Sequence, residues 1–167
     1  EGWSQKVWLH LSVPDEQAHE LFPGVKRSVA PQAGQVAVAA RFDDALIQIL
    51  EQGGRVLLLP DGQRGSLPLN AHWFLRGAPY VPDHPLAQRA PRAFWIEQQH
   101  FDLASAVIPE IKYLAEIDPV LMLWDTHDLK TVKTHGLLFE TRAGQGRLLV
   151  SAFRHGEPWN AAGQWLL

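Results

Sequence analysis

The chain has 167 residues, a length that suits one folded domain. Hydrophobic residues make up 46% and charged residues 20%, a globular balance that excludes disorder for the bulk of the chain. The net charge of −3 provides no basic face, so we expect no nucleic-acid partner. Cysteine is absent, which excludes disulfides, thiol nucleophiles and cysteine-ligated metals. No apolar run is long enough to span a membrane, so we expect no membrane partner.

A weakly alternating segment at 7–13 comes first and predicts a strand. The clearest pattern follows, from 35 to 60. The unbroken apolar run Val36–Ala40 is typical of a strand that is covered on both faces. Asp43 or Asp44 then provides a helix cap, since a carboxylate accepts hydrogen bonds from the first free backbone N–H groups.

The helix that follows has an apolar stripe at helical spacing, made by Phe42, Leu46, Ile49 and Leu50. The pair Gly53-Gly54 ends it, because glycine accepts the left-handed conformation at a helix terminus. A second buried strand is predicted at 56–59. Strand, helix and strand within so short a stretch indicate a βαβ unit with parallel strands.

The second half of the chain predicts antiparallel structure. Residues 120–124 are a strand candidate, and the runs 136–142 and 147–153 flank a loop of about four residues that contains two glycines, which is a hairpin signal. Between the two halves, 61–119 holds many prolines and predicts loops with short elements. A helix is expected to begin near Pro158.

No nucleophile motif is present. A G-x-S-x-G turn is missing, and Ser66 lies in the polar segment 62–66, which is typical of a loop. The pair Gly62 and Gly65 lacks the lysine and the helix that a phosphate-binding loop needs. We therefore name no catalytic residue and expect no cofactor.

Metal binding has one candidate cluster. Asp125, His127, Asp128 and His135 are close in sequence, and imidazole with carboxylate can hold zinc or iron. Their spacing matches no known signature, and a polar loop between two strands would hold the same residues for solubility. We favour the second interpretation and predict no metal site.

Paired carboxylates are the requirement for a glycosidase. Acidic residues are available, as in any domain of this size, and the most interesting is Glu140, which follows apolar residues inside a predicted strand. An ion pair or hydrogen bond on the outer face is the favoured role of Glu140.

Tryptophan is abundant, with seven Trp against two Tyr. Most Trp residues pack in a core, but an indole on a loop can stack on the apolar face of a sugar ring. Trp73, Trp95 and Trp124 lie in or near the irregular middle and are candidates for such a contact. His84, which precedes Pro85, is typical of a residue that braces a turn.

The order of several motifs resembles the C-terminal region of bacterial glycoside hydrolase family 2-like proteins, which include putative beta-galactosidases and sugar-binding-domain proteins. The similar stretches, in order, are 41–46, 50–60, Trp73-Phe74, His84-Pro85-Leu86-Ala87, Trp95, 121–125, 136–150 and 159–167. The resemblance extends from about Val7 to Leu167. Two stretches depart from the family pattern: no Phe-Pro-Thr follows His84, and the segment around Trp95 is less rich in tryptophan.

The resemblance implies an α/β fold of the flavodoxin-like or class I amidotransferase-like type, without a nucleophile. We therefore expect a three-layer sandwich with a mainly parallel sheet and an antiparallel hairpin at its C-terminal edge. Residues 1–167 would form a single accessory domain excised from a longer, multidomain glycosidase. The catalytic acid pair would lie elsewhere in the parent chain, and the parent would be periplasmic or secreted.

Three functions remain open. The first is a non-catalytic accessory domain that supports the catalytic domain of the parent chain or shapes its cleft. The second is an independent carbohydrate-binding module, with an oligosaccharide as partner and Trp73, His84, Trp95 and Trp124 as candidate contacts. The third is a small hydrolase that uses the region of Asp125 and His127, and we rank it last.

Overall fold

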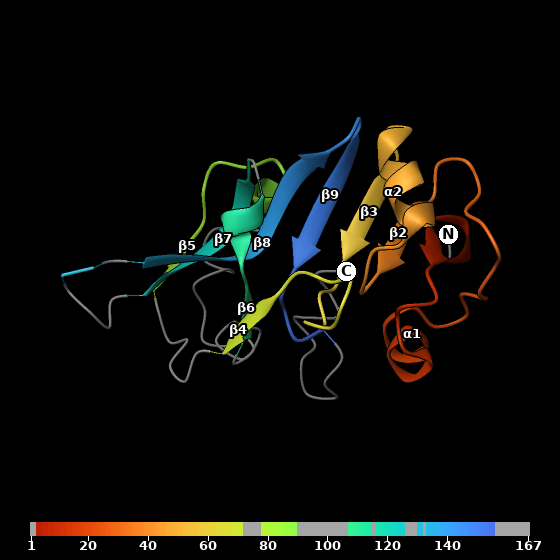
Figure 1. Cartoon of the computed structure of the whole chain (residues 1–167), viewed down its shortest axis with the longest axis horizontal. Helices are drawn as coiled ribbons and strands as arrows, with labels where there is room; N and C mark the ends of the chain where they lie inside the picture. Colours follow the sequence, from red (N-terminus) through yellow and green to blue (C-terminus); the bar gives the residue numbers. More distant parts are fainter. Residues whose placement is uncertain are drawn as a thin grey trace.

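The computed structural model of the chain describes residues 3–71, 78–89, 107–114, 116–125, 130–131 and 133–155. Its main feature is a seven-stranded sheet with the order β1-β2-β3-β9-β8-β7-β5. Neighbours from β1 to β9 pair in parallel, and those from β9 to β5 pair antiparallel. Figure 1 shows the parallel strands beside α2 and the antiparallel strands extending away from it. The expected α/β fold is therefore confirmed.

The parallel half follows the predicted pattern. The strands are β1 (Val7–Leu9), β2 (Val36–Ala39) and β3 (Arg55–Leu58), and the helix between the last two is α2 (Asp44–Glu51). Asp43 caps α2, since its Oδ1 accepts a hydrogen bond from the Leu46 N–H at 3.0 Å. Gly53 has φ +84°, as a glycine that ends a helix requires. The βαβ unit predicted for 36–59 is confirmed.

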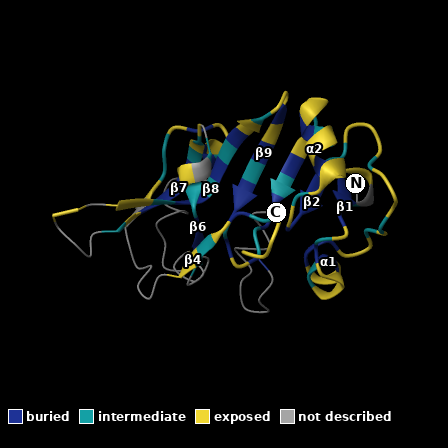
Figure 2. Cartoon of the chain, in the orientation of Figure 1, coloured by how far each residue is buried: buried dark blue, intermediate teal, exposed yellow. Residues whose placement is uncertain are grey.

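Two apolar clusters lie on opposite faces of this half of the sheet. Successive side chains of a strand point to opposite faces, and Trp8 and Val38 belong to different clusters from their strand neighbours. Leu46 and Leu50 of α2 pack in one cluster, and Ala18 and Leu21 of α1 (Asp15–Leu21) pack in the other. The parallel strands are thus the middle of three layers, and Figure 2 shows β1 and β2 mainly in the dark colour of buried residues.

The predicted hairpin is formed by β8 (Lys133–Ala143) and β9 (Gly146–Ser151), with a turn of two residues rather than four. β9 does not lie at the margin of the sheet, because it pairs in parallel with β3 on its other side. The turn packs on the end of α2, where a Cβ on Gly146 would lie 2.4 Å from the Gly54 carbonyl oxygen. β7 (Asp118–Asp125) and β5 (Ala78–Tyr80) complete the sheet.

The middle of the chain contains short elements, as predicted. β4 (Leu69–Ala71) and β6 (Val107–Pro109) form a separate antiparallel pair, which Figure 1 shows next to the carboxyl ends of β3 and β9. The 3₁₀ turns among the described residues are η1 (Trp3–Gln5), η2 (Ala87–Arg89) and η4 (Ile111–Tyr113). The helix expected from Pro158 lies outside the described residues. α1 was not predicted, because it has only seven residues and follows a proline.

Candidate functional site

Polar side chains gather where the parallel strands end. His10 follows β1, Asp43 follows β2, Asp61 follows β3, and Ser151 with His155 stands at the end of β9. Because parallel strands end at the same edge of a sheet, these groups belong to one side of the molecule. Open α/β sheets bind ligands at this edge, which makes it the first candidate for a functional site.

His10 connects Ser12 to Asp43. The His10 Nδ1 lies 2.8 Å from the Ser12 Oγ, and the His10 Nε2 lies 2.8 Å from the Asp43 Oδ2. The Ser12 Oγ also accepts hydrogen bonds from the backbone N–H groups of Ala40 and Arg41, at 2.9 and 3.1 Å. The residue types are those of a hydrolytic triad, but the serine oxygen already accepts two backbone donors. The arrangement therefore joins β1, β2 and the start of α2.

The carboxyl group of Asp43 has a lowered pKa. Burial raises this pKa, but the hydrogen bonds from the Leu46 N–H and from His10, with the charge of His10, lower it by more. Asp43 is thus held as a carboxylate that caps α2.

Asp61, which follows β3, is paired with Arg41. Its Oδ2 accepts a hydrogen bond from the Arg41 Nε at 2.6 Å.

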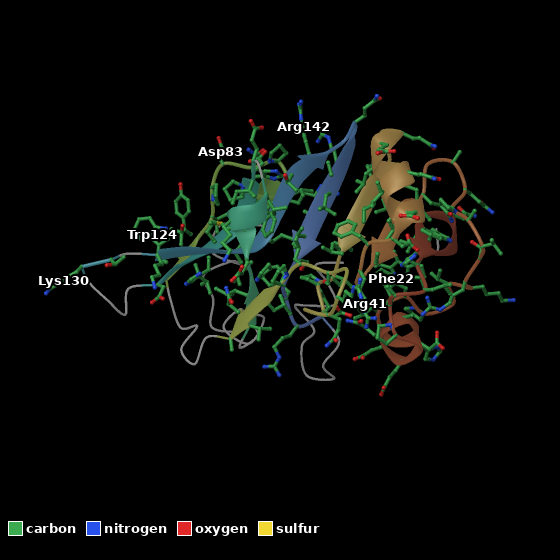
Figure 3. All side chains as sticks on the ribbon, viewed as in Figure 1. Phe22, Arg41, Asp83, Trp124, Lys130 and Arg142 are labelled. Carbon is green, nitrogen blue, oxygen red and sulfur yellow. The ribbon has the colours of Figure 1, made fainter. Side chains whose placement is uncertain are left out.

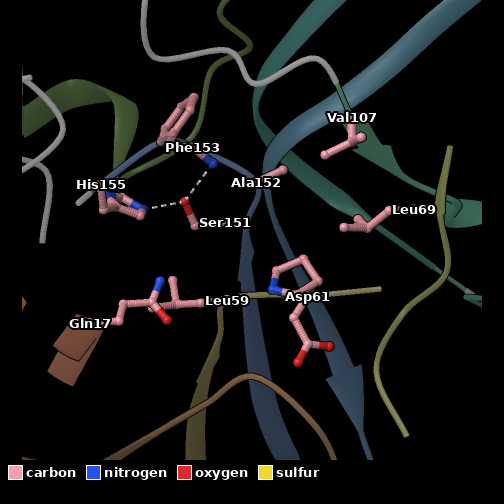
Figure 4. A pocket seen from close by; sticks show the side chains of 10 residues that line it. Gln17, Leu59, Asp61, Leu69, Val107, Ser151, Ala152, Phe153 and His155 are labelled. Atoms are coloured by element: carbon pink, nitrogen blue, oxygen red, sulfur yellow. Dashed lines mark hydrogen bonds between the residues drawn. The ribbon is translucent and has the colours of Figure 1, made fainter. Parts of the chain in front are cut away.

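A pocket of about 190 Å³ lies between the carboxyl ends of β3 and β9 and the β4–β6 pair (Figure 4). Ser151 and His155 form its polar wall, with the Ser151 Oγ 2.7 Å from the His155 Nε2, and both residues are buried. Leu69 of β4 and Val107 of β6 lie across from them. The carboxylate of Asp61 points away from the pair, as Figure 4 shows.

His84, one of the predicted sugar contacts, is buried. Its Nδ1 accepts a hydrogen bond from the Leu86 N–H at 3.1 Å, which places the ring proton of the neutral histidine on Nε2. The Nε2 lies 3.4 Å from the Asp118 Oδ2 and 3.9 Å from the Glu140 Oε2. The interpretation of His84–Pro85 as part of a turn agrees with the hydrogen bond from the Gln88 N–H to the His84 carbonyl oxygen.

Asp118 and Glu140 face each other across β7 and β8. Glu140 also accepts a hydrogen bond from Arg147 at 3.0 Å, so it has the ion pair that was favoured from the sequence. A shallow pocket of about 400 Å³ is lined by both carboxylates and by Arg147. Arg147 and His84 offset the repulsion between the carboxylates of Asp118 and Glu140.

Trp124 is exposed, with 44% of its surface accessible, and Tyr80 beside it is 48% exposed. Their ring centroids lie 5.8 Å apart and their planes are inclined by 36°. The two residues come from the paired strands β5 and β7. Figure 3 shows Trp124 in the half of the molecule away from Phe22 and Arg41. Trp8, by contrast, is buried, and its Nε1–H donates to the Ser28 carbonyl oxygen.

Of the four predicted sugar contacts, the structure describes His84 and Trp124, which lie on different parts of the antiparallel half. Trp73 and Trp95 lie outside the described residues, as do His127 and Asp128 of the candidate metal cluster. Within that cluster, the His135 Nε2 lies 3.4 Å from the Asp125 Oδ2. Among the residues that the structure describes, no group of three or more His, Asp or Glu side chains is arranged to hold a metal ion.

The sequence reasoning missed Tyr80 and the Ser151–His155 pair. Tyr80 has no motif around it, and its contact with Trp124 depends on the pairing of β5 with β7. The sequence signal of the second site is a serine at a strand end with a histidine four residues later, which is not part of the G-x-S-x-G pattern. None of the described helices is long and apolar enough to span a lipid bilayer.

The chain matches the family described as "Domain of unknown function (DUF8487)" over residues 37–163, more than half of its length. It therefore belongs to that family. The match covers the βαβ unit from Ala37 onward, the antiparallel half and the lining of the pocket at Ser151 except Gln17. No curated protein matches the chain at a significant level.

Proposed function

We propose that this chain is an accessory domain of a glycoside hydrolase family 2-like enzyme and that it contacts carbohydrate through Tyr80 and Trp124. The observation that carries the proposal is the exposure of these two neighbouring rings on β5 and β7. Together with the order of sequence motifs, this pair favours a sugar-facing role. Cleavage of the glycosidic bond would belong to the catalytic domain of the parent chain.

An exposed aromatic pair is costly for a soluble domain unless a partner covers it. Burial of apolar surface stabilises by roughly 25 cal/mol per Å². A partner that covers the two half-exposed rings would therefore gain binding free energy from their burial. A pyranose ring has an apolar face of C–H groups and hydroxyls at its rim. Indole and phenol rings match this chemistry, since each combines a flat apolar face with a polar group.

The arrangement of carboxylates supports placing glycosidic cleavage elsewhere. A glycosidase needs one acid to donate a proton and a second to act as base or nucleophile. Glu140 is bound by Arg147, and Asp118 faces His84. These contacts favour the use of both acids in joining β7, β8 and β9 over their use as an acid pair.

A second candidate is that the same rings dock on the catalytic domain and shape its cleft. The exposure of Tyr80 and Trp124 favours this candidate as well, because exposed apolar patches also mark protein interfaces. The two candidates differ in what the isolated chain binds. Only the carbohydrate contact predicts sugar binding in the absence of the parent enzyme.

The test is a tryptophan-fluorescence titration of the folded chain against a panel of plant and algal oligosaccharides. We expect a saturable change with one glycan class and its loss in Trp124→Ala and Tyr80→Ala. Leu11→Ala is the matched control, because Leu11 is an exposed apolar residue that follows β1, outside the aromatic pair. A flat response of the folded wild-type chain across the panel would overturn the sugar contact and leave the docking candidate.

A further inference from the structure

The pocket at the end of β9 contains a serine and a histidine at the distance of a nucleophile and its base. The Ser151 Oγ lies 2.7 Å from the His155 Nε2. A nucleophile and its base are typically separated by about 2.6–3.2 Å, the length of a hydrogen bond. Both residues are at least nine-tenths buried, yet their atoms line a half-open pocket. The pair is thus shielded from bulk water but faces a space that a small molecule can enter.

Within the described part of the chain, Ser12 also contacts a histidine, and Ser151 differs from it in the hydrogen bonds that its oxygen accepts. The Ser12 Oγ accepts two backbone hydrogen bonds, from Ala40 and Arg41, so both lone pairs are occupied. The Ser151 Oγ accepts a backbone hydrogen bond only from the Phe153 N–H among the described contacts, and that bond is long, at 3.4 Å. A lone pair of Ser151 is therefore available for attack when its proton is donated to His155.

The lining of the pocket defines the ligand that it fits. Leu59, Leu69, Val107 and Phe153 make an apolar wall, and the polar side chains of the lining are Ser151, His155, Gln17 and Asp61. The volume of about 190 Å³ is below the roughly 300–1,000 Å³ of pockets for drug-sized ligands, so the bound group must be small. A short acyl chain fits the apolar wall, and its carbonyl carbon would then lie at the serine.

We propose that Ser151 and His155 form a nucleophile–base pair that hydrolyses short-chain acyl esters. This activity does not depend on the sugar contact proposed above. The Ser151 Oγ attacks the ester carbonyl carbon while His155 Nε2 takes the serine proton. The alcohol leaves as the ester C–O bond breaks, and His155 returns the proton to it. Water then attacks the acyl-serine, which releases the carboxylic acid and restores the serine hydroxyl.

The first experiment treats the chain with diisopropyl fluorophosphate and measures the intact mass. A Ser Oγ–P bond forms and fluoride leaves, so an active serine gains one phosphoryl group. We expect one adduct on the wild type and on Ser12→Ala, and none on Ser151→Ala. The wild type and Ser12→Ala should hydrolyse p-nitrophenyl acetate, and Ser151→Ala should not. His155→Gln should lower the rate of hydrolysis by about 10²-fold or more.

Ser151→Cys keeps the test decisive if Ser151→Ala does not fold. The chain has no cysteine, so a single introduced thiol can be followed with iodoacetamide. We expect Ser151→Cys to be alkylated at least tenfold faster than Ser28→Cys, whose parent hydroxyl donates to the Ala30 carbonyl oxygen. His155→Gln should remove the difference, because the histidine makes the thiolate. Absence of an adduct on folded wild-type chain, or an adduct that persists in Ser151→Ala, would overturn the proposal, as would slow alkylation of Ser151→Cys.

Discussion

The imidazole Nε2 of His10 lies 2.8 Å from the Asp43 Oδ2, and this contact joins the end of β1 to the start of α2. The other carboxylate oxygen of Asp43 accepts the Leu46 N–H, so one side chain both caps the helix and holds the neighbouring strand. His10 in turn contacts Ser12, which accepts two backbone donors that follow β2. The edge where parallel strands end is thus held together by side chains.

Two substitutions of Asp43 distinguish its role as the cap of α2 from its ion pair with His10. We expect Asp43→Ala to lower the free energy of unfolding by about 1–2 kcal/mol, since it removes an N-cap and a partner of His10. Asp43→Asn should cost less than Asp43→Ala, because asparagine caps as well as aspartate and the loss is confined to the contact of the carboxylate with His10. Urea denaturation of the three proteins measures the difference. Equal losses for the two variants would show that the cap does not contribute.

The stability that Asp43 provides should depend on pH. Its pKa in the folded chain lies below the ordinary value of 3.8, which stands for the unfolded chain, so the folded state favours the ionised form. This contribution is fully present above pH 3.8 and is lost as the pH falls through the lower pKa of the folded chain. The stability gap between wild type and Asp43→Ala should therefore shrink as the pH falls below 3.8. A gap that widens over this range contradicts the assignment.

Gly146 should not tolerate a side chain. A Cβ there would lie 2.4 Å from the Gly54 carbonyl oxygen and 2.8 Å from that of Leu50, and backbone atoms cannot move aside cheaply. We expect Gly146→Ala to cost about 1–3 kcal/mol or more through overpacking of the hairpin against α2. Gly24→Ala is the control, since its Cβ would meet no atom within 4 Å and only its φ of +81° is unfavourable. Thermal unfolding that ranks the two variants the other way would refute the close contact.

The contribution of His84 to stability should depend mainly on its contacts with Asp118 and Glu140. We expect His84→Ala to be destabilising, because it leaves a cavity and two facing carboxylates without their shared donor. Adding Asp118→Asn should restore part of the loss, so the double-mutant cycle should give a coupling of about 0.5–3 kcal/mol. Asp118 is itself mostly exposed, so Asp118→Asn alone should be nearly neutral. Strictly additive losses would indicate that His84 acts only through packing.

Local pattern predicted the parallel half of the fold well. The helix α2 was identified from one cap and one apolar stripe, and the neighbouring strands from unbroken apolar runs, because all these signals lie within a few residues. The hairpin was identified from the glycines near Gly144. The insertion of β9 beside β3 was not predicted, because strand order depends on pairing between segments far apart in the chain.

The candidate sites were harder to predict for the same reason. His84 was singled out, but its position near Glu140 depends on the fold of a segment distant in sequence. Trp124 was among the aromatic candidates, whereas its partner Tyr80 was not, because the two meet only across β5 and β7. The Ser151–His155 contact is local, and a search for serine and histidine at a strand end would have found it.

The most direct test of the proposed function compares affinities and stabilities in one experiment. Wild type, Trp124→Ala and Leu11→Ala are titrated by calorimetry with the glycan that gives the largest fluorescence change, and each is unfolded in urea. We predict that Trp124→Ala binds at least tenfold more weakly, about 1.4 kcal/mol, with a stability change within about 1 kcal/mol. Leu11→Ala should bind like the wild type. Unchanged affinity in Trp124→Ala, or a stability loss of about 3–5 kcal/mol typical of a core aromatic, would contradict the account.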